Sequence, residues 1–196
     1  MAYLYQTDTG IYYLHEYYPV KYRHISDEQE EIRRKIWAYK DQENEAISEF
    51  TNEFMAAIAA IMQHYTASKI GLVAVPPSKV GKPSPVRTSI ENIVFWYKTG
   101  ITASTFGFNR QIYDYGSLLQ RTSDIPTAHQ GVRATYEEQK ASISCRTSRL
   151  WRYNTSFFIL DDVTTKGTSM DVCRDILVEN GAHPDRIYRL AIAKTV

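Results

Sequence analysis

Two neighbouring carboxylates, Asp161 and Asp162, directly follow the apolar run of residues 157–160. Adjacent like charges repel, and neither can be buried without a partner. Carboxylates in such a position could bind sugar hydroxyls or a metal ion. The next segment, TKGTS at 165–169, offers hydroxyls, a lysine and a permissive glycine, a combination that suits phosphate oxygens. Together, the acids and the turn suggest a site for a ribose 5-phosphate.

A simpler explanation of the same residues is a capped loop, with Thr168 or Ser169 as the first cap of a helix. The spacing of a nucleotide P-loop is absent, and so is a dinucleotide fingerprint. The combination of strand, acid pair, polar turn and helix favours the phosphate site, whereas the acid pair alone favours the loop.

The elements around these residues indicate how the site would be built. Residues 156–162 predict a buried strand, and residues 168–180 predict a helix that ends at Gly181. In open parallel sheets, ligands bind beyond the carboxyl ends of the strands. The acids and the polar turn would occupy that position.

Strands and helices alternate along the second part of the chain. The sequence predicts a strand within 69–79 that ends in a loop at its two prolines, strands at 112–119 and 185–196, helices at 88–98 and 132–143, and a loop at 121–131. The first part predicts a hairpin at 3–18, a helix capped at Ser26, and a second helix with an apolar stripe through 47–62. The expected fold class is therefore α/β, Rossmann-like, with a central mostly parallel sheet flanked by helices and a small N-terminal hairpin. We expect one domain over 1–196, with the hairpin and first helices in 1–65 and the α/β core in 70–196.

The composition is that of a soluble globular protein: 43% hydrophobic and 23% charged residues, with a formal net charge of +1. This charge argues against a nucleic-acid-coating surface. The first residues lack the features of a signal peptide, and no apolar run is long enough to span a membrane. The two cysteines, Cys145 and Cys173, form neither a metal motif nor a disulfide framework, so we expect a cytoplasmic protein.

The segment FFILDDVTTKGTS resembles the signature of type I phosphoribosyltransferases. The resemblance implies that Asp161 and Asp162 bind the ribose hydroxyls of phosphoribosyl pyrophosphate (PRPP). It also implies that the following turn holds the 5-phosphate, through Thr165, Lys166, Gly167, Thr168 and Ser169. Lys166 stands where the family commonly has a second threonine.

Further segments are similar to the ComF-like branch of this family. They are the helical segment IWAYKDQENEAISEFTNEF, the loop AVPPSK, and the region LLQRTSDIPTAHQGVRATYEEQKASI. The resemblance implies that Ser78 and Lys79 bind pyrophosphate, together with Arg121 and Arg133 of the last region.

The reaction implied by the resemblance displaces pyrophosphate from C1 of the ribose, with Mg²⁺ carried by PRPP and possible contacts to Asp161 and Asp162. Lys79 and Arg121 would act catalytically by neutralising the leaving group, Arg121 arriving on a loop that closes. Each of these cations could equally be a surface charge. His129 is a candidate base or a solvated loop residue. The aromatic N-terminal segment could form a hood over the acceptor or cover a sheet edge.

Two other functions fit the same residues. One is a non-catalytic regulatory protein that binds PRPP or a nucleotide, because the same fold can carry different functions. The other is a DNA-uptake accessory protein. We expect a transferase whose partners are PRPP and a small-molecule acceptor, with no membrane; a homodimer is compatible with the sequence.

Overall fold

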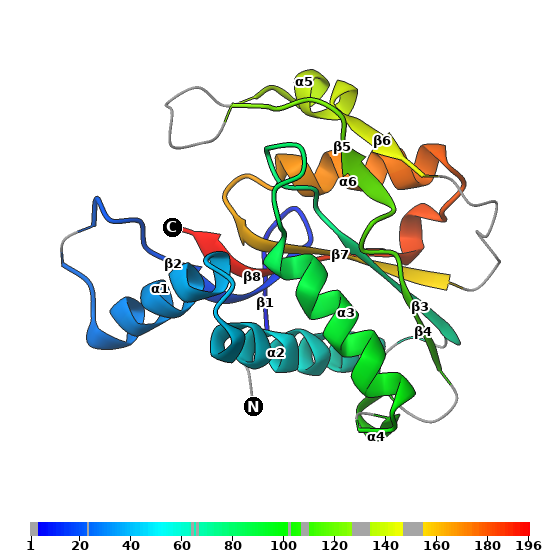
Figure 1. Ribbon diagram of the computed structural model, residues 1–196, viewed down its shortest axis with the longest axis horizontal. Helices are drawn as coiled ribbons and strands as arrows, with labels where there is room; N and C mark the ends of the chain where they lie inside the picture. The colour runs from blue at the N-terminus through cyan, green and yellow to red at the C-terminus, as the bar shows by residue number, and fades with distance from the viewer. Residues whose placement is uncertain are drawn as a thin grey trace.

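The computed structural model describes residues 4–22, 24–63, 65, 67–101, 103–106, 110–126, 134–146 and 155–196. Its main feature is a six-stranded sheet with the order β1-β2-β8-β7-β3-β4 (Figure 1). All neighbouring strands are parallel except β1 and β2, which are antiparallel. The strands are β1 Tyr5–Gln6, β2 Ile11–Tyr17, β3 Lys69–Ala74, β4 Gln111–Asp114, β7 Thr155–Thr164 and β8 Ile187–Thr195.

The central strand β7 explains why its apolar run is continuous. Phe158 and Leu160 pack into the core on one face of the sheet, whereas Phe157 and Ile159 pack into the core on the other face. A strand covered on both faces must be apolar at every position, as in parallel sheets whose crossover helices lie on both sides. The structure confirms the predicted α/β fold.

Helices cover both faces of the sheet (Figure 1). One face carries α1 (Asp27–Lys40), α2 (Asn44–Met62) and α3 (Pro85–Lys98), and the other carries α6 (Thr168–Glu179). Ser26 and Gln29 form the predicted capping box at the start of α1. Helix α3 begins earlier than the predicted residue 88, because Ser84 caps it and Pro85 fits its first turn.

A smaller unit lies above α6 (Figure 1). It consists of β5 (Leu119–Arg121) and β6 (Ile143–Cys145), which pair antiparallel, and of α5 (Tyr136–Ala141) between them. Two short helices, α4 (Ala103–Phe106) and η2 (Pro184–Arg186), complete the described elements.

The single strand predicted at 112–119 is wrong, because the chain turns within it. The side chain of Asp114 accepts a hydrogen bond from the backbone N–H of Gly116 at 2.7 Å, and this turn ends β4. Residues 119–121 then pair with β6 in the second sheet. The helix predicted at 132–143 is also too long, since a capping box at Thr135 starts α5 and Ile143 already belongs to β6.

The N-terminal hairpin is present, and its second strand belongs to the main sheet. Residues 11–17 of β2 pair in parallel with β8, so the hairpin covers that edge of the sheet. The turn of the hairpin is held by Arg189, which donates to the carbonyl of Thr9. Among the helices that the structure describes, none is long and apolar enough to cross a membrane.

Candidate functional site

A cavity of about 690 Å³ opens at the carboxyl ends of β3 and β7. From β3 the chain runs through α3 to β4 on one side, whereas from β7 it runs through α6 to β8 on the other side. The order of strands therefore reverses between β3 and β7, which is the position where open α/β sheets bind ligands. The cavity is lined by residues 75–78, 82–86, 121, 125–126, 134–136, 139 and 161–169, together with Lys40.

The acid pair lies where β3 stops and β7 continues. β3 pairs with β7 as far as Ala74 and Leu160, whereas β7 pairs with β8 up to Thr164. The predicted strand end at 162 is therefore two residues short, because β8 still supplies hydrogen bonds there. Asp161 and Asp162 therefore lie on a strand at the edge of the cavity. The pairing of this strand with β8 fixes their backbone.

The two carboxylates have few partners of their own in the described part of the chain. Asp161 accepts a hydrogen bond from the backbone N–H of Asp162 at 2.9 Å, and Asp162 accepts one from the N–H of Val163 at 2.6 Å. The Nζ atom of Lys40 lies 3.6 Å from Oδ2 of Asp162. Burial raises the pKa of Asp161 well above its usual range, and repulsion by Asp162 adds to this effect. A ligand that donates hydrogen bonds or brings a cation would stabilise the charged carboxylate.

The turn after the acids is shaped by Gly167. This residue has a φ of +81°, and a Cβ atom at its position would overlap Cδ1 of Ile11. Glycine avoids both the strained backbone conformation and this overlap. Gly167 is the N-cap of α6 and no side chain caps the helix, so the first N–H groups of α6 are available to an anion.

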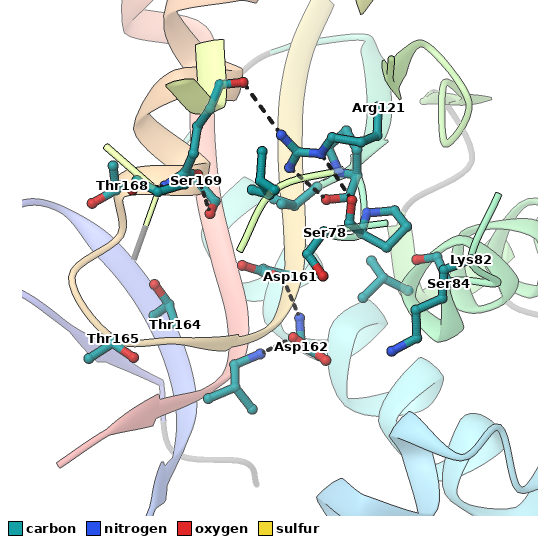
Figure 2. A pocket seen from close by; sticks show the side chains of 18 of the residues that line it. Ser78, Lys82, Ser84, Arg121, Asp161, Asp162, Thr164, Thr165, Thr168 and Ser169 are labelled. Atoms are coloured by element: carbon teal, nitrogen blue, oxygen red, sulfur yellow. Dashed lines mark hydrogen bonds between the residues drawn. The ribbon is translucent and has the colours of Figure 1, made fainter. Parts of the chain in front are cut away.

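Figure 2 shows the two walls of the cavity. Thr168 and Ser169 lie on one side and Lys82 and Ser84 on the other, and in this view Asp161, Asp162 and Ser78 lie between them.

All five predicted phosphate ligands line the cavity: Thr165, Lys166, Gly167, Thr168 and Ser169. Ser169 already has a partner, because its hydroxyl donates to Oε1 of Gln139 at 2.7 Å. Thr165 donates to the hydroxyl of Thr195 at 3.3 Å. The structure thus brings the whole predicted turn together with the acid pair.

Arg121 occupies a different setting from the one expected. It lies in β5, not on a loop, and is only 8% exposed. Its guanidinium donates to the carbonyl oxygens of Pro77 at 3.0 Å and Pro76 at 3.3 Å. It also donates to the hydroxyl of Ser142 at 2.5 Å and to the carbonyl of Gln139 at 3.4 Å. Burial lowers the pKa of Arg121. The side chain therefore ties the loop after β3 to the unit formed by α5 and β6.

The other predicted pyrophosphate ligands lie in different places. Ser78 lines the cavity, whereas Lys79 is exposed and lines a second cavity beyond the same loop. Lys82 lines the first cavity instead, at a position that no sequence motif marks. The predicted ligand Arg133 and the candidate base His129 lie outside the described residues.

Lys40 and Gln139 were not singled out from the sequence. Lys40 ends α1 and reaches Asp162 across 122 positions of the chain, a contact that no local pattern could reveal. Gln139 is buried beside Ser169 for a similar reason. The only sequence signal was the position of Lys40 in a helical segment similar to one in the ComF-like branch.

The charges around the cavity favour an anion that carries hydroxyl groups. Its described lining has four cations, Lys40, Lys82, Arg121 and Lys166, against the carboxylates of Asp161 and Asp162. Within the described residues no group of three or more His, Cys, Asp or Glu side chains could hold a metal ion. This donor set fits Mg²⁺ that is bound mainly by a ligand's own oxygens, with one or two carboxylates from the protein.

Comparison of the sequence with known protein families and with curated proteins gave no match. The function must therefore be argued from the site itself.

Proposed function

We propose that the protein is a PRPP-dependent phosphoribosyltransferase, which transfers ribose 5-phosphate to a base or amine and releases pyrophosphate. One observation carries the proposal: the pair Asp161 and Asp162 shares a single cavity with the turn 165–169, at the switch point of the sheet. Carboxylates accept hydrogen bonds from ribose hydroxyls, and the N–H groups at the start of α6 bind phosphate. In this proposal the acid pair binds the hydroxyl end of a ribose 5-phosphate and the turn binds its phosphate end.

In this proposal the leaving pyrophosphate lies towards the opposite wall. Ser78 and Lys82 line that wall, and α3 begins there without an acidic residue in its first turn. As the bond from C1 to pyrophosphate breaks, positive charge grows on the ribose and negative charge grows on the leaving group. Lys82 and the positive end of α3 would stabilise the leaving group.

Mg²⁺, when bound with PRPP, would neutralise part of the pyrophosphate charge. Asp161 and Asp162 would hold the ribose 2- and 3-hydroxyls or contact the ion, and Lys40 would balance their charge. The pair would thereby fix C1 between the two walls, so that an acceptor nitrogen could approach from the face opposite to the leaving group.

Arg121 enters this proposal as a positioning residue. Its guanidinium is already bonded to the carbonyls of Pro76 and Pro77, whose loop forms the pyrophosphate wall. It would act by holding that loop in place. This arrangement differs from the catalytic role that the resemblance implies for the same side chain.

A regulatory protein that binds PRPP without transfer is the second candidate. It is favoured by the engagement of Arg121 with main-chain carbonyls, because that cation is then not free to neutralise a leaving group. Both candidates require the same ligand, so binding and turnover must be measured separately.

Thermal unfolding with Mg²⁺ alone and with Mg²⁺ plus PRPP tests the binding step. Ligand at 100 times its Kd stabilises a protein by about 2.7 kcal/mol, which corresponds to roughly 5–10 °C for a chain of this size. We expect this shift in the wild type and its loss in Asp161→Asn/Asp162→Asn. A control that removes two charges elsewhere, Glu28→Gln/Asp185→Asn, should keep the shift. Without a shift at millimolar PRPP the proposal fails.

Pyrophosphate release then separates the two candidates. A panel of nucleobases and amines is incubated with the protein, PRPP and Mg²⁺, and pyrophosphate is quantified. Release that depends on one acceptor supports the transferase. A thermal shift without release for any acceptor supports the regulatory protein.

A further inference from the structure

Helix α3 buries one side in the core of the protein and exposes the other. Its buried side chains pack with the sheet and with α2. The opposite side exposes Arg87, Glu91, Phe95 and Lys98. Residues that follow one another at intervals of three or four positions lie on the same side of a helix. These four residues therefore form a single stripe along the outer surface of α3.

The stripe ends in the most exposed apolar side chains of this part of the molecule. Phe95 is 61% exposed, more than any other aromatic side chain that the structure describes. Ile101, three positions after the end of α3, is 68% exposed, the highest value among the large apolar side chains described. Burial of such surface is favourable. The C-terminal half of α3 is therefore where contact with another protein surface would gain most.

The charges of the stripe make it complementary to a second copy of itself. When two copies of α3 lie antiparallel about a twofold axis at Phe95, residues before Phe95 in one copy lie opposite residues after it in the other. Glu91, four positions before, then faces Lys98, three positions after, in the second copy. By symmetry this contact of opposite charges occurs twice, on either side of the two phenylalanine rings.

Both charged groups are available for such a contact. Glu91 pairs through Oε1 with Nε of Arg87 at 3.0 Å, which leaves its other carboxylate oxygen for a second cation. Lys98 forms no ion pair with another described residue. A like-charged surface would repel its own copy, whereas this stripe attracts it.

We propose that the protein forms a twofold-symmetric dimer through the stripe of α3, with Phe95 against Phe95 at the centre and Glu91 against Lys98 on both sides. The contact of one helix with its copy is smaller than the about 800 Å² per partner of a standard interface. We therefore expect a reversible dimer with a Kd in the micromolar range.

The dimer would leave the candidate site open. Helix α3 begins at the first cavity, which Pro85 lines, and ends beside α4 (Figure 1). Phe95 lies about 15 Å further along the helix axis than Pro85. The inference therefore does not rest on the proposed function, because it needs neither the acid pair nor the turn 165–169.

Sedimentation velocity over a series of protein concentrations, up to millimolar, tests the dimer. We expect the wild type to pass from monomer to dimer in this series. Phe95→Ser should weaken the association by about tenfold or more, because it removes the central aromatic side chain of the interface. The control is Val20→Ser, which removes a similarly exposed apolar side chain (64%) between β2 and α1 and should change nothing.

Charge reversal tests the antiparallel arrangement. Lys98→Glu places a carboxylate opposite Glu91 of the second copy, and Glu91→Lys places an ammonium group opposite Lys98. Each change alone should weaken the dimer, whereas Glu91→Lys/Lys98→Glu should restore it, because the pair forms again with its charges exchanged. The loss of the exposed pair with Arg87 should matter little to the fold. Thermal unfolding shows whether each variant is folded.

Three results would overturn the proposal. A wild type that stays monomeric at millimolar concentration would mean that the stripe does not bind a second copy. Equal dimerisation of Phe95→Ser and Val20→Ser would place the interface on another face of the protein. A double charge variant that associates no better than the single ones would exclude the antiparallel pairing of Glu91 with Lys98.

Discussion

Asp161 is held in the folded protein at a place where its charged form is disfavoured. Burial raises its pKa, so at pH values above the ordinary aspartate pKa this group lowers the stability of the free protein. We expect Asp161→Asn to make the free protein more stable, by on the order of 1 kcal/mol, while abolishing stabilisation by PRPP. Denaturant unfolding of both proteins at pH 7 measures the first effect.

The pH dependence of this difference follows from the direction of the shift. Between the ordinary aspartate pKa of about 3.9 and the raised value in the fold, the folded state binds a proton that the unfolded state has released. The contribution of Asp161 to stability therefore falls as the pH rises through that window, and it is flat above the raised pKa. The stability gain of Asp161→Asn should grow across the window. A gain of the same size at every pH would show that the charge of Asp161 is not the cause.

Gly167 allows a prediction with a close control. Gly167 and Gly100 both have a φ of +81°, but only at Gly167 would a Cβ atom overlap a neighbour, Ile11. Replacement by alanine should cost about 1 kcal/mol or more at either position because of backbone strain. We expect Gly167→Ala to cost at least about 1 kcal/mol more than Gly100→Ala, because Ile11 must also move.

Denaturant unfolding of the two glycine variants measures this difference, and PRPP thermal shifts show its effect on the turn. Gly100→Ala should keep the shift and Gly167→Ala should lose it. Equal destabilisation by the two changes would mean that the contact with Ile11 does not shape the turn.

Among the elements, α5 is hydrogen-bonded to α6 beside the turn 165–169. The hydroxyl of Ser169 donates to Gln139, and the amide of Gln139 donates to the carbonyl of Ala134 at 3.2 Å. Gln139→Leu would leave the buried carbonyl of Ala134 and the partly buried hydroxyl of Ser169 without these partners. We expect it to destabilise the protein by about 1–3 kcal/mol and to raise the Kd for PRPP.

A neighbouring contact between the same helices provides the control. Lys140 pairs with Glu179 on the exposed side of α5 and α6. Exposed pairs contribute little, so Lys140→Gln should change neither stability nor PRPP affinity measurably. Calorimetric titration and thermal unfolding of both variants provide the comparison. If the two variants behave alike, the contact of Gln139 with Ser169 does not support the turn.

The sequence predicted the elements whose signals are local. The apolar run 157–160 and the helix from Thr168 were identified because burial on both faces and a polar turn before a helix leave direct marks on composition. The strand predicted at 112–119 failed because Asp114 and Gly116 form a turn inside an otherwise strand-like segment. Polar turns can interrupt such a segment without changing its overall hydrophobicity.

In the candidate site, too, the residues with a local sequence signal were predicted and those that depend on distant contacts were not. One short segment of the sequence contains Asp161, Asp162 and the turn 165–169, so this part of the site could be predicted without knowing the fold. Arg121 was expected to face the ligand, but the carbonyls of Pro76 and Pro77 take up its donors. Which partner such a cation finds depends on contacts between distant segments, and a single sequence does not reveal them.

In the whole molecule, the N-terminal hairpin is part of the structure that supports the turn 165–169. Arg189 of β8 forms an ion pair with Asp171 in the first turn of α6 and donates to the carbonyl of Thr9 in the hairpin turn. Ile11 of β2 lies against Gly167. The N-terminal hairpin and the last strand, β8, therefore both contact the start of α6.

Arg189→Gln should loosen this arrangement. The side chain is only 14% exposed, and it makes a charge-assisted hydrogen bond, so its loss should cost about 1.5–3 kcal/mol. That corresponds to a fall in Tm of roughly 3–12 °C. Because Ile11 and α6 are then less firmly placed, PRPP binding should weaken as well. Arg34→Gln is the control, since that guanidinium on α1 is 74% exposed. If Arg189→Gln is less stable but binds PRPP with unchanged affinity, the role of the hairpin is only to stabilise the edge of the sheet. If both stability and PRPP affinity fall, the hairpin and β8 together hold the binding site in place.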